Sequence, residues 1–187
     1  MRLRRQLGTV ASLGLAAALW AASASAQVVN SAAKPIALNA TLNQSLSVNL
    51  SGNAVNFNLV AGSANNPGST TITATTSWTL NQLIGLVSVY AFFSSSTAAL
   101  TDGAGHNIPS ADFQISDNGG AFTALTSTAP FGGANAGMTV GQTLIIFLFN
   151  AKGSRTDVMK FNINLAPLPS LPPGNYTGTL TIQAQAI

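Results

Sequence analysis

The segment 36–50 alternates between apolar and small polar residues, and this pattern constrains the fold more than any other feature of the sequence. Gln44 is the one polar residue among its even positions, and the odd positions are mostly Asn, Ser and Thr. A period of two places the even set on one face of an extended strand. The even apolar residues are Ile36, Leu38, Ala40, Leu42, Leu46, Val48 and Leu50. Such a face needs other strands to cover it, so the pattern predicts a β protein, with two strands or a bend near Gln44.

Further strand patterns recur along the rest of the chain. Alternation predicts strands at 55–59, 72–80, 161–165 and 176–184 and a hairpin over 113–125, with Trp78 in the core. The runs 86–93 and 143–149 are apolar on both faces, which is typical of buried strands. Glycine, asparagine and proline predict turns or loops at 61–69, 94–109, 129–141, 152–155 and 166–173. Without a helical period, this order predicts an antiparallel immunoglobulin-like β-sandwich.

The first 26 residues have the pattern of a cleaved signal peptide. Arginines at the start precede an apolar run over 7–22, and Ala24-Ser25-Ala26 is a small-x-small cleavage pattern. We therefore expect an exported protein, in the periplasm, outside the cell or on its surface. The pair Arg4-Arg5 leaves both the general secretory and the twin-arginine route open. The mature chain would comprise a flexible leader, 27–35, and one β-sandwich domain, 36–187, with no second apolar run long enough to span a membrane.

Removal of the signal peptide changes the charge of the chain. The formal net charge of +3 includes three arginines of the signal peptide, so the mature chain is neutral. Its charged residues are Lys34, Lys152, Arg155, Lys160, Asp102, Asp112, Asp117 and Asp157. Neutrality excludes a basic nucleic-acid surface and removes the usual repulsion between copies. Because the chain has no cysteine, it depends on its core rather than on disulfides.

Catalytic and metal-binding residue types are scarce. His106 is the sole histidine and there is no glutamate, so a hydrolase would need His106, Asp102 and Asp112 to meet in one cleft. The loop that holds these residues does not have the spacing of a calcium-binding loop. Zinc is disfavoured without cysteine and with one histidine. The sequence predicts no catalytic residue, no metal, no cofactor and no enzymatic activity.

The C-terminal region carries a family resemblance. Pro173-Gly174-Asn175-Tyr176, followed by an alternating strand, resembles the ending of spore coat protein U-type secreted domains and chaperone–usher pilins. The segment 36–50 is similar to the N-terminal region of a pilin. The resemblance implies an incomplete sandwich that a strand from a neighbour or a chaperone completes. The cysteine pair that is usual in these families is not found in this chain.

Two functions follow as hypotheses. The first is a non-enzymatic structural or surface protein, a pilin-like or coat-like subunit that assembles through strand pairing with itself or with a periplasmic chaperone. Its strand-pairing candidates are Ile36, Leu38, Ala40, Leu42, Leu46 and Val48. The segment that holds them is either the domain's own first strand or a strand donated to a neighbour. The alternative function is a module that binds a polysaccharide or matrix polymer by stacking on Phe131 and Tyr90.

Overall fold

The computed structural model describes residues 32–41, 43–81, 84–146 and 151–187. The chain forms two units, residues 1–40 and 41–187, and each is described by itself. In the first unit, residues 32–40 form neither helix nor strand and are exposed. The predicted signal peptide lies outside the described residues, as do Leu42 and the end of the predicted strand at 143–149.

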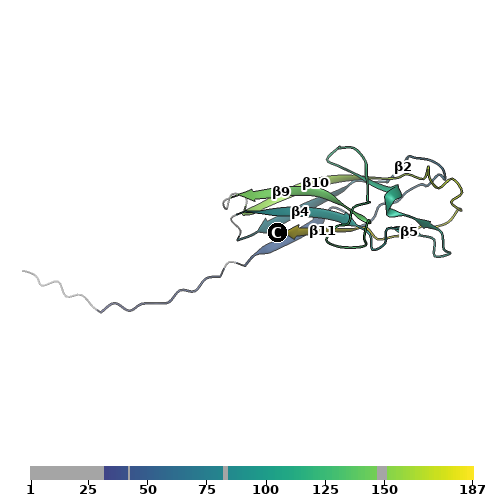
Figure 1. The fold of residues 1–187 in the computed structure, drawn as a ribbon. Helices are drawn as coiled ribbons and strands as arrows, with labels where there is room; N and C mark the ends of the chain where they lie inside the picture. Colours follow the sequence, from purple (N-terminus) through teal and green to yellow (C-terminus); the bar gives the residue numbers. More distant parts are fainter. Residues whose placement is uncertain (1–31, 42, 82–83, 147–150) are drawn as a thin grey trace, which may run out of the picture. The chain divides into compact units, whose positions relative to one another are not determined.

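The second unit is an all-β structure, as the alternating patterns predicted, and every strand pair is antiparallel (Figure 1). The larger sheet has six strands, in the order β1(Ser45–Leu50), β3(Ile72–Thr79), β10(Lys152–Ile163), β7(Phe113–Asp117) and β8(Thr123–Ala124), with β2(Asn66–Pro67) also on β10. The smaller has three, in the order β11(Thr181–Ala186), β4(Ile84–Phe92) and β9(Gly137–Ile146). A short hairpin joins β5(Leu100–Thr101) to β6(Asn107–Ile108), and a 3-10 turn spans Ser110–Asp112. No helix in the described ranges is long and apolar enough to cross a membrane.

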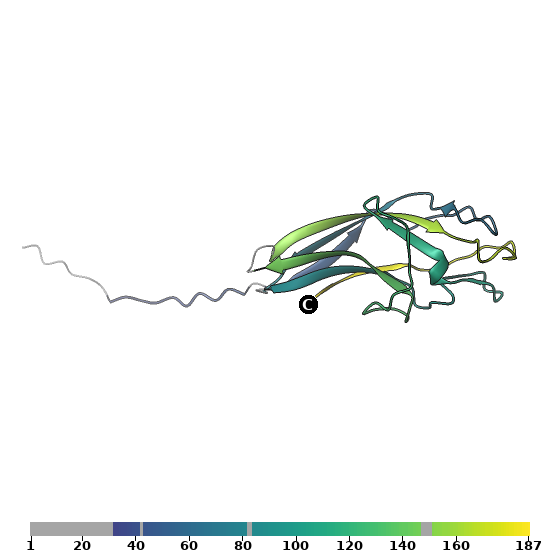
Figure 2. The same cartoon turned by 45° about the horizontal axis from the view of Figure 1, so that its top comes forward.

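The two larger sheets face each other across an apolar core, an arrangement consistent with a β-sandwich (Figure 2). Alternate residues of β3, β4 and β10 point inward and are buried, as Ala74, Val89 and Phe161 illustrate. Trp78 is buried as predicted, but it belongs to a smaller cluster with Val87 and Ile145 rather than to the main core. Burial of these side chains supplies the hydrophobic stabilisation of the fold.

Several local predictions differ from the structure. The final strand, expected over 176–184, begins only at Thr181, and the loop expected at 94–109 contains the β5–β6 hairpin. The strand expected over 36–50 begins only at Ser45, and the segment 55–59 forms a single bridge, Phe57 to Gly68, instead of a strand. The turn expected at 152–155 is wrong, because those residues are the start of β10. Their inward positions hold Gly153, against which the Trp78 ring packs, and Arg155, so no apolar period is visible. Strand β9 starts at Gly137, inside the loop predicted at 129–141.

Candidate functional site

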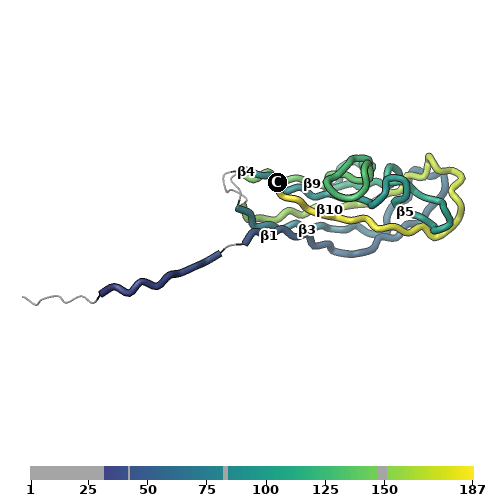
Figure 3. The backbone as a smooth tube through the Cα atoms, turned by 60° about the horizontal axis from the view of Figure 1, so that its bottom comes forward, coloured from purple at the N-terminus to yellow at the C-terminus, as the bar shows by residue number. Residues whose placement is uncertain are grey.

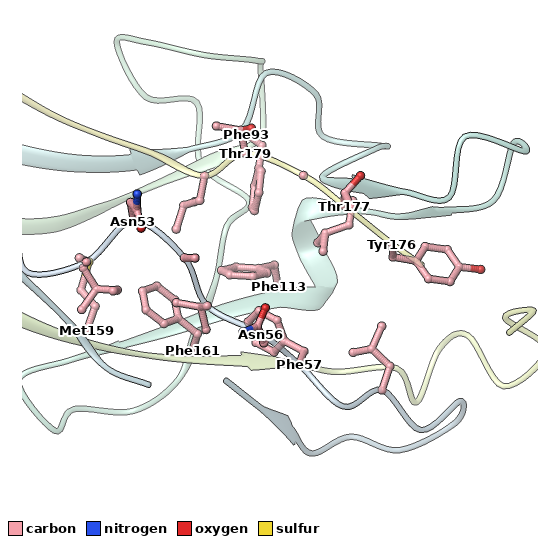
Figure 4. A pocket seen from close by; sticks show the side chains of 18 of the residues that line it. Asn53, Asn56, Phe57, Phe93, Phe113, Met159, Phe161, Tyr176, Thr177 and Thr179 are labelled. Carbon is pink, nitrogen blue, oxygen red and sulfur yellow. The ribbon is translucent and has the colours of Figure 1, made fainter. Parts of the chain in front are cut away.

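A groove of about 720 Å³ opens along one side of the sandwich. Residues 52–60, which follow β1, form one wall, and residues 174–180, which precede β11, form the other. Core side chains such as Phe113, Met159 and Phe161 form its floor (Figure 4). The tube view in Figure 3 shows the C-terminal segment (yellow) running along the domain to the point marked C, near the labels β4 and β9. The groove therefore gives access to the hydrophobic core between two segments that are distant in sequence.

Both walls are extended segments with incomplete backbone pairing. In 52–60, the carbonyl of Asn56 accepts a hydrogen bond from the N–H of Ser69, and Phe57 forms a bridge with Gly68. Both partners lie on the side of the large sheet. In 174–180, Thr177 exchanges backbone hydrogen bonds with Thr101. Among the described parts of the chain, it is the one residue of this wall that exchanges backbone hydrogen bonds with another segment. Unpaired backbone groups along an extended segment are those that an added strand would bind.

The wall 174–180 is held in place by the β5–β6 hairpin and by its own tyrosine. The Tyr176 hydroxyl donates a hydrogen bond of 2.8 Å to the carbonyl of Pro172. Gly178 packs so closely that a Cβ there would meet the carbonyl oxygen of Ala99. Burial, then the charge of Asp102, raises the pKa of the Tyr176 hydroxyl, so it stays a donor at neutral pH.

A histidine–aspartate pair closes the same hairpin. His106 Nδ1 lies 2.6 Å from Asp102 Oδ2, and Asp102 Oδ1 accepts backbone N–H bonds from Ala104 and His106. The hydrogen bond with His106 is the main cause that lowers the pKa of Asp102. Asp112 lies apart, buried in the 3-10 turn, and no hydrogen bond or ion pair between described residues joins it to this pair. The three residues that a hydrolase would need are therefore not joined in one site.

The structure divides the predicted strand-pairing residues into two groups. Leu46 and Val48 lie on β1, where they are half-buried and pack on the core clusters of their own domain. Ile36 and Leu38 expose 83% and 90% of their surface, and Ala40 is also exposed. Leu42 lies outside the described residues. The segment 32–40 thus presents an alternating apolar set that is still exposed to solvent.

The two predicted stacking aromatics meet on the outer face of the small sheet. The ring centroids of Tyr90 and Phe131 are 6.1 Å apart in an edge-to-face contact, and Phe131 also lies 5.9 Å from Phe92. Tyr90 and Phe131 are each half-buried. The rings therefore cover part of one another's surface, and what remains exposed is smaller than two free rings would offer to a sugar.

Within the described ranges, no group of three or more His, Cys, Asp or Glu could hold a metal. Inside the sandwich, Arg155 Nε donates to Asp157 Oδ1 at 2.7 Å, and Arg155 Nη2 lies 3.9 Å from Asp117 Oδ2. Burial, then the charge of Asp157, raises the pKa of Asp117. This cluster links the sheets rather than opening to a cleft, because the Arg155 guanidinium also donates to the carbonyl of Gln142 on β9.

Comparison with known proteins gives no family assignment: no family model, no curated protein and no solved structure matches the chain. The groove must therefore be interpreted from its own geometry.

The sequence marked the two segments beside the groove, although it predicted them as strands, and it did not show the groove itself. Alternation is visible at 55–59 and at 176–184, and Val55, Phe57, Leu59, Leu180 and Ile182 all line the groove. What the sequence did not show is that these two segments face each other without pairing.

Proposed function

We propose that this chain is an exported, non-enzymatic structural subunit whose immunoglobulin-like sandwich is incomplete along one side. Copies assemble when the alternating segment around 36–40 of one copy enters the groove of the next copy and pairs with its walls. The observation that carries this proposal is the groove between 52–60 and 174–180, with core residues as its floor.

The chemistry of the groove suits an extended peptide better than a small polar ligand. The floor is aromatic and aliphatic, and the walls add Val55, Leu59 and Leu180. A strand places alternate side chains on one face, so apolar residues at every second position would pack on such a floor while the others remain in water. Backbone groups of the walls would supply the hydrogen bonds of strand addition.

The chain itself contains a segment that fits this description. Ile36, Leu38 and Ala40 stand at alternate positions, and the intervening Ala37 and Asn39 are small. Burying an exposed Ile or Leu side chain contributes about 1.5–3 kcal/mol, so two such residues supply a substantial driving force. The mature chain has equal numbers of acidic and basic residues, so association meets little charge repulsion. A periplasmic chaperone that fills the groove before assembly is consistent with the same geometry.

The test is the mass of the exported chain measured by size-exclusion chromatography with light scattering. We expect a series of large oligomers. Ile36→Asp with Leu38→Asp should abolish the series, since both charges would enter the apolar groove, and the groove of this variant should bind a synthetic peptide of residues 32–44. The matched control, Ala37→Asp with Asn39→Asp, adds the same charges to the opposite face of the strand and should still form the series. An exported chain that forms no large oligomers, together with a groove that does not bind the peptide, would refute the proposal.

The contact between Tyr90 and Phe131 favours a second function, a module that binds a neutral polysaccharide. An aromatic cluster on a sheet face provides stacking surface for a sugar ring, and the contact holds both rings in place. Retention on glycan columns should fall when Phe131 is replaced by Ala and should be unaffected by the Ile36→Asp, Leu38→Asp pair. Equal retention of the Phe131→Ala variant would argue against this function.

A further inference from the structure

An exposed aliphatic patch lies on the outer face of the small sheet, away from the residues that line the groove. Its members are Ile84 (66% exposed), Leu144 (53%), Ile146 (43%), Ile187 (63%) and the half-buried Leu86. Their neighbours Val87 and Ile145 are buried between the sheets, so alternation directs the patch residues outward. Large aliphatic side chains gathered at the surface mark interaction sites more often than scattered ones do.

Strand register brings these residues into two adjacent rows. Ile84 pairs with Ile146 and Leu86 pairs with Leu144 across β4 and β9. Leu86 and Ile187 exchange backbone hydrogen bonds of 2.8 and 3.0 Å, which extends the second row to Ile187, the residue after β11. Directly opposite residues of antiparallel strands have Cβ atoms about 4.5–5.5 Å apart, so the five side chains form one continuous surface.

The strands that hold the patch carry no charged side chain. Strands β4, β9 and β11 contain no Asp, Glu, Lys or Arg. The next row along the sheet is polar and neutral: Gln142 Nε2 donates a hydrogen bond of 3.1 Å to Ser88 Oγ, and Gln185 pairs with Ser88 on the other side. An apolar centre with an uncharged polar border is the composition of a protein–protein interface, where charged residues are depleted at the core.

We propose that the aliphatic patch binds the same patch on a second copy of this chain in a two-fold contact. A two-fold contact brings identical surfaces together, so it is favoured on a face that does not repel itself, and strands without charged side chains provide such a face. A lipid surface is a poorer match, since membrane-surface sites carry Lys or Arg beside Trp or Phe anchors, which the patch lacks. The contact is independent of the groove and would join subunits laterally.

The experiment uses the full exported chain with Ile36→Asp and Leu38→Asp, so that strand donation through the groove does not contribute. Sedimentation equilibrium should give a concentration-dependent dimer. Adding Leu144→Lys, or separately Ile84→Lys, should weaken the dimer by at least about tenfold, because each places a charge at the centre of the contact. Thr156→Lys adds the same charge to an exposed position on β10, in the other sheet, and should leave the dimer unchanged.

The outcomes separate this proposal from the proposed function. A sample that stays monomeric at every concentration, or a dimer that both lysine variants leave intact, overturns the patch contact. A monomer that co-sediments with phosphatidylcholine vesicles, and no longer does so with Leu144→Lys, overturns it in favour of lipid. If strand donation fails instead, the chain without Ile36→Asp and Leu38→Asp would also stop at a dimer, and that dimer would be sensitive to Leu144→Lys. Circular dichroism of each variant checks that the exposed substitutions leave the fold intact.

Discussion

The guanidinium group of Arg155 lies directly against the backbone of Gly141, so that a Cβ on this glycine would stand 2.5 Å from Arg155 Nε. Arg155 is on β10 and Gly141 is on β9, which belong to different sheets. The guanidinium donates to Asp157 Oδ1 and to the carbonyl of Gln142, each at 2.7 Å. Arg155 thus connects the two sheets at β9, which is an edge strand of the small sheet.

Gly141→Ala should destabilise the domain by about 1–3 kcal/mol, the usual cost of adding a methyl group to a filled site. The guanidinium cannot move away without breaking its bonds to Asp157 or Gln142. Urea denaturation followed by tryptophan fluorescence measures the loss. Gly174→Ala is the matched control, since its Cβ would have no neighbour closer than 3.6 Å. Equal midpoints for the two variants would show that Arg155 adapts freely.

Arg155 also illustrates why the sequence predicted the existence of the strands better than the residues at which they begin and end. Period-two alternation is visible where inward positions are apolar, as in β3 and the second half of β10. Where the inward residues are Gly153, Arg155 and Asp157, the same strand has the composition of a turn. Gly153 accommodates the Trp78 ring of the neighbouring strand, and Arg155 makes a contact across the sandwich; local sequence carries no information about either contact.

The groove was beyond sequence reasoning for a related reason. Alternation states which face of a segment is apolar, but not whether another strand covers that face. The segments 36–40 and 46–50 have the same pattern, yet Leu46 is packed in its own domain and Ile36 is exposed. The difference arises because β1 pairs with β3 along Ser45–Leu50, whereas 32–40 forms no strand.

Asp117→Asn should raise the free energy of unfolding at neutral pH. One oxygen of this carboxylate, Oδ1, is buried without a hydrogen-bond partner, and burial raises the pKa of the group above its ordinary 3.8. The folded state therefore binds the proton more tightly than the unfolded state. Stability falls as the pH rises from 3.8 through the raised pKa, and the substitution removes that fall. Unfolding by urea between pH 3 and pH 8 measures the difference.

Asp102→Asn is a control for which we expect the opposite effect on stability at neutral pH. The hydrogen bond with His106 lowers the pKa of Asp102 in the folded state, so its ionised form stabilises the hairpin. That contribution is present above the ordinary pKa and is lost as the pH falls through the lowered one. We expect Asp102→Asn to reduce stability at neutral pH. The same direction of change in both variants would contradict the assigned causes.

Asn66→Ala should destabilise the domain by about 1–3 kcal/mol, because the buried carbonyl of Ile163 and the part-buried N–H of Val60 lose their hydrogen bonds to this side chain. The Asn66 side chain accepts a bond from the Val60 N–H at 2.7 Å and donates to the carbonyl of Ile163 at 2.8 Å. The exposed Asn65→Ala variant should change stability little, and urea denaturation compares the two. Since Val60 ends one wall of the groove, Asn66→Ala should also weaken binding of the 32–44 peptide. Unchanged stability would mean that water replaces the amide at this site.

Tyr176→Phe tests whether the hydroxyl of this residue positions the groove wall 174–180. The substitution removes the hydroxyl that donates to Pro172 and keeps the ring, so we expect a lower midpoint in urea denaturation. Binding of the 32–44 peptide, measured in the Ile36→Asp, Leu38→Asp background, should also weaken, because the wall 174–180 loses one of its anchors. Tyr90→Phe removes the hydroxyl of the other of the two tyrosines, which does not line the groove, and should leave peptide binding unchanged. Normal peptide binding by Tyr176→Phe, despite its lower stability, would mean that the bridge between Thr101 and Thr177 alone positions the wall.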